Sequence, residues 1–326
     1  METFCLELLR EWVARGNGAT LYASFPGGVR DEDVPSGVER VCWNVRARRS
    51  FCRIARWLRT RPDDPCLALS QELAVVLAVL KKLRLIRNRV YYRESTDVAL
   101  HYGKAFKLIM RLLWPVLDGV IEQSRAGEEE TRRICCGRLP KCLVVRNLMR
   151  APELGAGFEI ADSSCVRLAC LGSFKPRKGQ GRLVEELSKD KADDWSLTFW
   201  GDGERRADVE AMAVDGGFAV GRVRFNDWER DRARIWAECD MAVIPSDYEG
   251  LPNVMLEALL NGKRVSVRPT CVGACELLRE IGLSGTWPWR SALAMPVSAW
   301  MDARAKLVGI CDPQRVAREI WNFIAE

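Results

Sequence analysis

The chain has 326 residues, of which 48% are hydrophobic and 29% charged, and it is therefore long enough and apolar enough for two globular domains. Its longest uncharged apolar run, residues 73–80, is far shorter than the roughly 20 residues that span a bilayer, and charges in the first turns argue against a signal peptide. Thirteen irregularly spaced cysteines without a C-x-x-C pair indicate neither a disulfide framework nor a zinc module, and a single histidine excludes mechanisms that need two imidazoles. We expect a cytoplasmic protein.

Charge is distributed unevenly along the chain. Residues 1–150 hold 27 Lys and Arg against 17 Asp and Glu, whereas the remainder holds 23 against 27. The difference predicts separate partners for the two halves, with an anionic surface or substrate on the amino-terminal side.

The first half begins with a helix and then alternates strands with helical segments. Apolar residues recur at helical spacing from Thr3 until Gly16 ends the helix. Short strand-like runs follow at residues 19–24, 38–45, 67–70, 90–94, 119–124 and 142–147. This alternation is typical of a parallel sheet in an α/β domain.

Residues Arg46–Arg61 form an unusually basic segment, with seven arginines around Phe51, Ile54, Trp57 and Leu58. Two interpretations fit a helix with one apolar face and an otherwise basic surface. Its apolar stripe can pack on the sheet, or the helix can lie on anionic lipid. We favour packing of the stripe and keep the arginines as an electrostatic contact with an anionic membrane surface, which would place the protein peripherally at the inner face of the membrane.

Residues 151–164, APELGAGFEIADSS, lack periodicity and read as an interdomain linker. We therefore expect a first domain over 1–152, a second over 153–311, and a last helix over 312–326. The second half repeats the α/β alternation, with strands expected at residues 166–171, 195–200, 241–244 and 264–268.

Two segments of the second half follow strands and lead into helices. One is the cationic turn 172–179, GSFKPRKG; the other is the stretch 244–264, IPSDYEGLPNVMLEALLNGKR, which places Glu249 and Glu257 eight positions apart. In a parallel sheet such loops lie at the carboxyl ends of the strands, where ligands bind, and a helix N-terminus favours an anion. We predict a phosphate site there. The alternative is that both acids are merely solvated on a helix.

The string EGLPNVMLE has Pro-Ser before it, and its last Glu begins the pattern E-A-x-x-x-G-K; it resembles the E-x7-E signature of retaining GT-B glycosyltransferases of the family-4 type, the group 1 glycosyl transferases. The resemblance implies an α/β GT-B fold, with two Rossmann-like doubly wound domains facing a cleft. The amino-terminal domain would bind the acceptor and the carboxy-terminal domain the nucleotide sugar. By resemblance, the donor sugar and its phosphate are held by Glu249, Gly250, Leu251, Pro252 and Asn253, and the ribose hydroxyls by Glu257.

The cationic turn resembles the G-R-L-x-x-x-K-G segment of the same family. Gly172 and Lys178 match, and Lys178 would neutralise the donor diphosphate as a catalytic group beside Glu249. The family's arginine position holds Ser173, so either Lys175 or Arg177 supplies the second charge or the site is weaker.

Two further candidate sites are expected, and a third motif is set aside. Phe225 and Asn226 occupy the place of the family's nucleotide base, while Glu94 and His101 are the acceptor-side candidates in the first domain. The sequence Asp31-Glu32-Asp33 matches the D-x-D metal motif of the other large glycosyltransferase fold, but it lies in a polar loop and we expect no metal there.

The implied activity is metal-independent, retaining hexosyl transfer from a UDP-, GDP- or similar nucleotide sugar to a glycan or lipid-linked acceptor in surface polysaccharide or glycoconjugate synthesis. The donor is a substrate, and no cofactor is expected. Fixed cations and helix N–H groups would stabilise the departing diphosphate. Rival readings are a phosphorylase, a nucleotide-sugar epimerase, a non-catalytic or truncated GT-B binding protein, and a nucleic-acid-directed glucosyltransferase, although we do not expect a nucleic-acid partner. The sugar, the base and the acceptor stay open.

The start of the chain departs from the family's pattern. A first strand and a glycine-rich loop precede the opening helix in the family, whereas Met1 already belongs to that helix here. We therefore expect the first strand to be missing from the middle of the amino-terminal sheet, and low or no activity from residues 1–326 alone.

Overall fold

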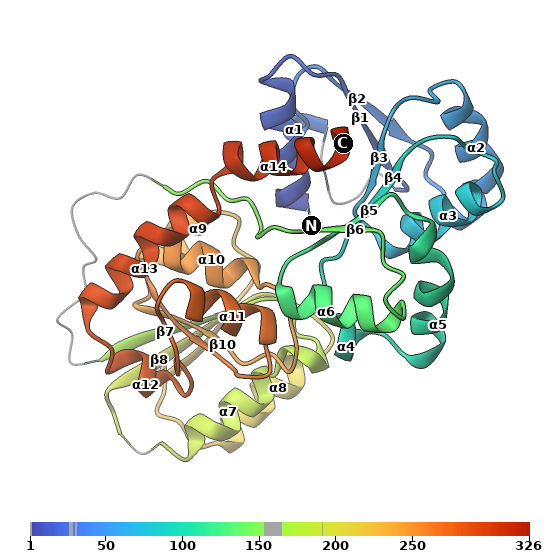
Figure 1. Ribbon diagram of the computed structural model, residues 1–326. Coiled ribbons are helices and arrows are strands. Elements are labelled where there is room, and N and C mark those ends of the chain that lie inside the picture. Colours follow the sequence, from blue (N-terminus) through green and yellow to red (C-terminus); the bar gives the residue numbers. More distant parts are fainter. Residues whose placement is uncertain (1, 26–28, 30, 153–164, 191) are drawn as a thin grey trace. The chain divides into compact units, whose positions relative to one another are not determined.

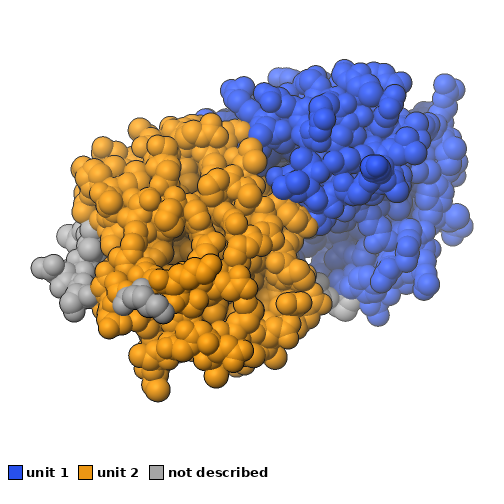
Figure 2. Space-filling view, turned by 90° about the horizontal axis from the view of Figure 1, so that it is seen from below, with its two compact units in different colours: residues 1–150, 310–326 blue, residues 151–309 orange. Residues whose placement is uncertain are grey.

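The computed structural model describes residues 2–25, 29, 31–152, 165–190 and 192–326. The chain divides into two compact units (Figures 1 and 2). Unit 1 comprises Met1–Arg150 and Ile310–Glu326, and unit 2 comprises Ala151–Gly309. The chain thus leaves unit 1 once and returns to it with its last helix.

Unit 1 carries parallel strands separated by helices, close to the positions expected from the sequence. Its elements are α1 (Glu2–Val13), β1 (Ala19–Ala23), η1 (Asp31–Asp33), β2 (Val38–Cys42), η2 (Ala47–Ser50), α2 (Phe51–Arg59), β3 (Cys66–Ala68), α3 (Gln71–Lys82), β4 (Val90–Arg93), α4 (Val98–His101), α5 (Lys104–Leu113), η3 (Trp114–Val116), β5 (Gly119–Glu122), α6 (Arg125–Ile134), β6 (Lys141–Val144) and α14 (Pro313–Ala325).

The strands of unit 1 form two separate sheets. One has the order β3-β4-β5-β6, and the other is the parallel pair β1-β2. Among the described residues, no strand joins β1 to β3, which agrees with the expectation that the first strand of this domain is missing. Arg61, in the segment between α2 and β3, bonds to both strands of the pair, since it donates to Thr20 Oγ1 at 3.1 Å and to Glu39 Oε2 at 2.8 Å.

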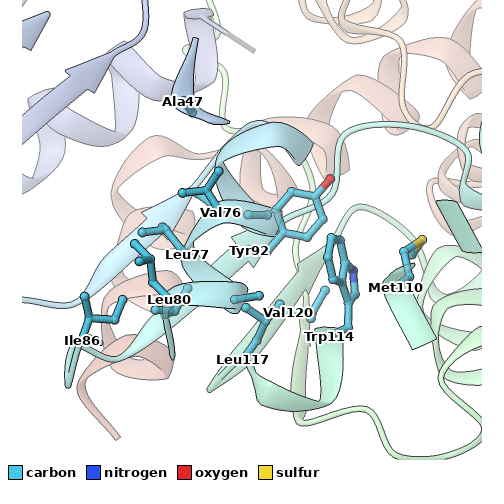
Figure 3. Close-up of a cluster of buried hydrophobic side chains, with 14 of the residues drawn as sticks. Ala47, Val76, Leu77, Leu80, Ile86, Tyr92, Met110, Trp114, Leu117 and Val120 are labelled. Carbon is cyan, nitrogen blue, oxygen red and sulfur yellow. The ribbon is translucent and has the colours of Figure 1, made fainter. Parts of the chain in front are cut away.

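The four-stranded sheet is buried on both faces, as its nearly continuous apolar strands predict. On one face, Tyr92 of β4 packs among residues of α3, α5 and η3, including Met110 and Trp114 (Figure 3). On the other face, Tyr91 packs in a second cluster with Phe4 of α1 and Phe323 of α14. Helices α1 and α14 also contact each other, and together they cover that face.

The basic segment Arg46–Arg61 folds into η2 and α2, and its apolar stripe faces inward. Ile54 and Leu58 are buried in the core, while Phe51 and Trp57 pack partly against it. The preferred interpretation, that the stripe packs inside the domain, is therefore confirmed. Six of the seven arginines of the segment are exposed.

Unit 2 is built around one continuous parallel sheet with the order β11-β10-β7-β8-β9. Its elements are β7 (Val166–Leu171), η4 (Pro176–Lys178), α7 (Gln180–Ser188), β8 (Trp195–Trp200), α8 (Arg206–Asp215), β9 (Val223–Asn226), α9 (Arg232–Ala237), β10 (Met241–Ile244), α10 (Asn253–Leu260), β11 (Arg264–Val267), α11 (Val272–Glu280), α12 (Trp289–Leu293) and α13 (Val297–Ile310).

The order of strands in unit 2 reverses between β7 and β10, because the chain winds outward to β8 and β9 on one side and to β10 and β11 on the other. In such sheets, ligands bind beyond the carboxyl ends of the two strands at the reversal. The loops that follow β7 and β10 are the two segments singled out from the sequence. Within the described ranges, no helix combines the length and hydropathy of a membrane-crossing segment.

Candidate functional site

The loops after β7 and β10 are fastened together by contacts between their backbones and side chains. The amide of Asp247 donates to the carbonyl of Arg177 at 2.8 Å, and the guanidinium of Arg182 pairs with the Asp247 carboxylate. Segments about 70 positions apart in the sequence therefore form one surface at the reversal point of the sheet.

Two glycines allow this close approach. Gly179 has φ of 70°, and a Cβ at this position would lie 2.2 Å from the carbonyl oxygen of Pro245, so any other residue would force the two loops apart. Gly201, at the end of β8, has φ of 147°, and its Cβ would lie 2.2 Å from the carbonyl oxygen of Gly172. The turn after β8 is thereby brought against the same loop.

The Glu249 carboxylate, in the loop after β10, contacts two cationic side chains of the loop after β7. Its Oε1 atom contacts Lys178 Nζ, lies 3.0 Å from Arg177 Nη1 and accepts a hydrogen bond from Ser246 Oγ at 3.2 Å. Lys175 is exposed. Arg177, and not Lys175, is therefore the second cation beside Lys178 and Glu249. Two cations against one carboxylate leave a local excess of positive charge.

Helix α10 begins where this charged cluster ends. Leu251 and Pro252 are buried and anchor the turn, whereas Gly250 and Asn253 are partly exposed. On the core side of α10, Leu256 and Leu259 are fully buried. The N-terminus of a helix carries the positive end of its dipole and N–H groups without intrahelical partners. It adds a third favourable feature for an anion next to Lys178 and Arg177.

Glu257 lies in the second turn of α10, and its side chain is 18% exposed. Burial raises the pKa of its carboxyl group, and the charge of Arg232 opposes that shift. Its Oε2 atom lies 3.4 Å from Arg232 Nε and has no hydrogen-bond partner among the described residues. A buried carboxylate oxygen in this state favours a ligand that brings a hydroxyl donor.

A pocket of about 360 Å³ lies at the carboxyl ends of β8 and β9. Phe225 and Asn226, the candidates for contact with the nucleotide base, line it together with Trp228. Arg232 connects the pocket to α10, since its guanidinium carbon lies 4.5 Å from the centroid of the Trp228 ring while its Nε atom faces Glu257. Neither Trp228 nor Arg232 was predicted. The only signal in the sequence is the aromatic and basic run DWERDRAR directly after β9.

The two acceptor-side candidates of unit 1 occupy different environments. Glu94 is 1% exposed, and its carboxylate accepts hydrogen bonds from the Tyr92 and Tyr102 hydroxyls and from the Ser95 and Thr96 amides. These bonds give it a structural role in the loop after β4. His101 is exposed, and its ring centroid lies 4.9 Å from that of Tyr102. An acceptor role for either residue stays a prediction.

The D-x-D sequence, Asp31 to Asp33, forms η1, where Asp31 pairs with Arg40. Within the part of the chain that the structure describes, no three or more His, Cys, Asp or Glu side chains gather as metal ligands would.

The sequence is similar to known glycosyltransferases. Residues 165–290 match the family model described as "Glycosyl transferases group 1". The chain is 37% identical to the lipopolysaccharide core biosynthesis glycosyltransferase LpsE of Rhizobium meliloti over 53% of this chain and 56% of that protein. The match therefore spans little more than half of the relative's length.

Solved structures resemble the chain over almost its whole length. Anabaena HepE in complex with UDP has a TM-score of 0.78 at 16% identity, covering 99% of this chain and 95% of that one. A glycosyltransferase from Rickettsia africae has a TM-score of 0.75 at 13% identity, covering 99% and 93%. The lipopolysaccharide outer core galactosyltransferase WaaB has a TM-score of 0.72 at 14% identity, covering 99% and 95%. The chain thus has the GT-B fold, and residues 165–290 of its second unit are similar to the group 1 glycosyl transferases.

Proposed function

We propose that this protein is a retaining, metal-independent glycosyltransferase of the hexosyltransferase type. Its donor is a nucleotide-diphosphate sugar, and its acceptor is a glycan or lipid-linked glycan in surface polysaccharide synthesis. One observation carries the proposal: a positive cluster, a helix N-terminus, a carboxylate oxygen without a hydrogen-bond partner among the described residues, and an aromatic pocket follow one another around α10. This order suits the successive parts of a nucleotide sugar. The names of the similar proteins, which include UDP complexes and lipopolysaccharide glycosyltransferases, support the same class.

Each part of the donor has a partner of matching chemistry in unit 2. The base enters the pocket beside Phe225 and Trp228, the ribose hydroxyls donate to Glu257, and the diphosphate lies between Lys178 and the N-terminus of α10. The donor sugar then reaches Glu249, whose second carboxylate oxygen orients a hydroxyl.

The charges of the site act on the leaving group. As the bond between the anomeric carbon and the diphosphate oxygen breaks, negative charge grows on the diphosphate. Lys178, Arg177 and the α10 dipole stabilise that charge without reorganisation, which is the role that a metal ion has in other transferases. By resemblance to the family, the acceptor hydroxyl forms its new bond on the same face of the sugar and gives its proton to the departing phosphate.

The decisive test is a calorimetric titration of the 326-residue chain with uridine, UDP, UDP-glucose and a GDP-sugar. A bound nucleotide at a hundred times its dissociation constant also stabilises the fold by about 2.7 kcal/mol, which thermal denaturation detects. Glu257→Ala removes the ribose partner and is expected to weaken both uridine and UDP by at least about tenfold.

Glu238→Ala is the matched control, because Glu238 is an exposed glutamate on the neighbouring segment. Normal nucleotide affinity in Glu257→Ala contradicts the ribose assignment. Failure of every nucleotide to bind contradicts the proposed function itself.

A further inference from the structure

Helix α5 of unit 1 exposes large apolar side chains on its outer face. Leu108 is 56% exposed, Leu112 52% and Ile109 37%. Met110 lies on the opposite face, fully buried beside Trp114 in the core (Figure 3). Packing in the core therefore accounts for the apolar residue on the inner face of α5 but not for the apolar residues on its outer face.

Two neighbouring helix ends extend this outer face. Lys82 Nζ, at the end of α3, donates to the carbonyl of Leu112 at 3.2 Å, which places Leu83, itself 58% exposed, beside the end of α5. Arg59 Nε, at the end of α2, donates to the carbonyl of Leu85 at 2.9 Å. The ends of α2, α3 and α5 thus meet on one flank of unit 1 (Figure 1).

The charge around these apolar residues has a single sign. Residues 98–117 contain no Asp or Glu, while Lys104 and Arg111 lie four positions before and three positions after Leu108 and so flank it on the helix surface. Lys82 and Arg84 at the end of α3 are exposed as well. We define the α5 surface as Lys82, Leu83, Arg84, Lys104, Leu108, Ile109, Arg111 and Leu112.

Acidic residues on the adjacent helix α6 do not cancel this charge. Glu128 pairs with Arg132 at 2.8 Å, and Glu130 pairs with Arg133 at 2.6 Å and lies 3.8 Å from Lys107. Glu128 and Glu130 are thus each matched by a base, and the third acid of α6, the exposed Glu129, carries one charge against the four basic residues of the α5 surface, which keeps its positive excess.

We propose that the α5 surface docks on an anionic lipid bilayer. Leu83, Leu108 and Leu112 enter the boundary between headgroups and acyl chains, and the surrounding lysines and arginines bind anionic headgroups. An amphipathic helix with exposed leucines and a basic margin has the features that favour binding in the plane of a membrane interface. A second copy of the chain fits this surface less well, since it would bring the basic residues of two copies against each other.

This assignment moves the membrane contact away from the segment Arg46–Arg61, where the sequence placed it. The apolar residues Ile54 and Leu58 of α2 are buried, so α2 has no apolar stripe to insert. The end of α2 reaches the same flank at Arg59, so the exposed arginines of α2 contribute only long-range electrostatic attraction to the anionic membrane.

Vesicle co-sedimentation of the full chain tests the proposal, with phosphatidylcholine vesicles compared with vesicles of phosphatidylcholine and phosphatidylglycerol. We expect binding to the anionic vesicles alone. Leu108→Asp with Leu112→Asp is expected to weaken this binding at least about tenfold, because both insertion and charge are lost. Lys104→Glu with Arg111→Glu is expected to weaken it roughly tenfold or more, and added salt to mimic that loss.

Val214→Asp is the matched control, since Val214 is 79% exposed on α8 of unit 2 and its replacement is expected to leave vesicle binding unchanged. Circular dichroism and thermal denaturation establish that the paired variants are folded, and calorimetry with UDP shows whether unit 2 is intact. Equal binding to neutral and anionic vesicles overturns the proposal. Unaltered binding of both paired variants overturns it too, as does a dimer that Leu108→Asp with Leu112→Asp dissociates, because the surface then belongs to a second copy.

Discussion

The two units of this protein use the same alternation of strands and helices and arrive at different sheets. In unit 2, β7 lies at the centre of five parallel strands and pairs with β8 at six positions. In unit 1, strands of the same type fall into a pair and a group of four. Because an interior parallel strand satisfies its backbone groups through two neighbours, a sheet is interrupted where no strand pairs with both β1 and β3, as is the case among the described residues. Local alternation alone therefore does not guarantee a continuous sheet.

The polar residues at the strand ends differ in the same way. In unit 1 they bond one another: Arg93 pairs with Asn147, and Thr131 donates to Glu122 at 2.6 Å. In unit 2, Lys178 and Glu249 come from different loops and meet at the reversal of strand order, and Glu257 keeps an oxygen without a hydrogen-bond partner among the described residues. The polar side chains of unit 1 thus hydrogen-bond within its interior, whereas those of unit 2 form a surface suited to a ligand.

The largest expected effect comes from breaking the contact between the two loops of unit 2. Gly179→Ala adds a methyl group against the Pro245 carbonyl at a positive φ, and we expect a loss of about 2 to 5 kcal/mol in unfolding free energy. Hydrogen exchange of the β7 and β10 amides localises the loss to unit 2. Gly217→Ala is the control, because Gly217 also has a positive φ but no atom lies within 4 Å of its Cβ position; it should lose only about 1 kcal/mol. Equal losses in the two variants would show that loop contact is unimportant.

The second-largest expected effect tests whether the positive cluster of Lys178 and Arg177 binds the diphosphate. Lys178→Ala removes a charge-assisted partner of the diphosphate, so UDP should bind about ten to a hundred times more weakly while uridine is unaffected. Arg177→Ala should act in the same direction and Lys178→Arg should restore part of the affinity, whereas Lys175→Ala, at the exposed lysine, should change nothing. In a transfer assay, Lys178→Ala should lower kcat more than it raises KM. Equal losses for uridine and UDP would separate Lys178 from the phosphates.

The smallest effect concerns the interior of unit 1. Burial, and to a lesser extent the charge of Glu94, raises the pKa of the Glu122 carboxyl well above its usual value. A raised pKa in the folded state means that stability is fully present below about pH 4.5 and is lost as the pH rises toward the folded-state pKa, by at most about 1.4 kcal/mol for each pH unit. Glu122→Gln should flatten this dependence, as measured by hydrogen exchange of β5 between pH 4 and 8. Glu129→Gln, at an exposed position, should leave it as it is. A wild-type stability that does not fall over this range would refute the assignment.

Much of unit 2 was predictable from the sequence because its signals are local. Apolar runs of four to six residues mark strands such as β7 and β10, and the proline, glycine and asparagine of the stretch 245–253 mark the loop before α10. Lys178 lies in the segment that follows β7 and Glu249 in the loop that follows β10, and the carboxyl ends of neighbouring parallel strands share one edge of the sheet. The helices α12 and α13 were not predicted.

Only the tertiary structure decided which residues meet. Arg177 rather than Lys175 lies at Glu249, because the carbonyl of Arg177 accepts a hydrogen bond from the Asp247 amide. Arg232 of α9 likewise lies beside Glu257 of α10. These outcomes depend on how closely two loops approach, which the positive φ of Gly179 permits and which periodicity does not encode. The sequence likewise determined that Arg46–Arg61 is basic and that its apolar residues fall on one face of a helix. Packing against the sheet decided which apolar faces are buried, because a helix with apolar residues on most of its surface can bury only the face that meets a neighbour.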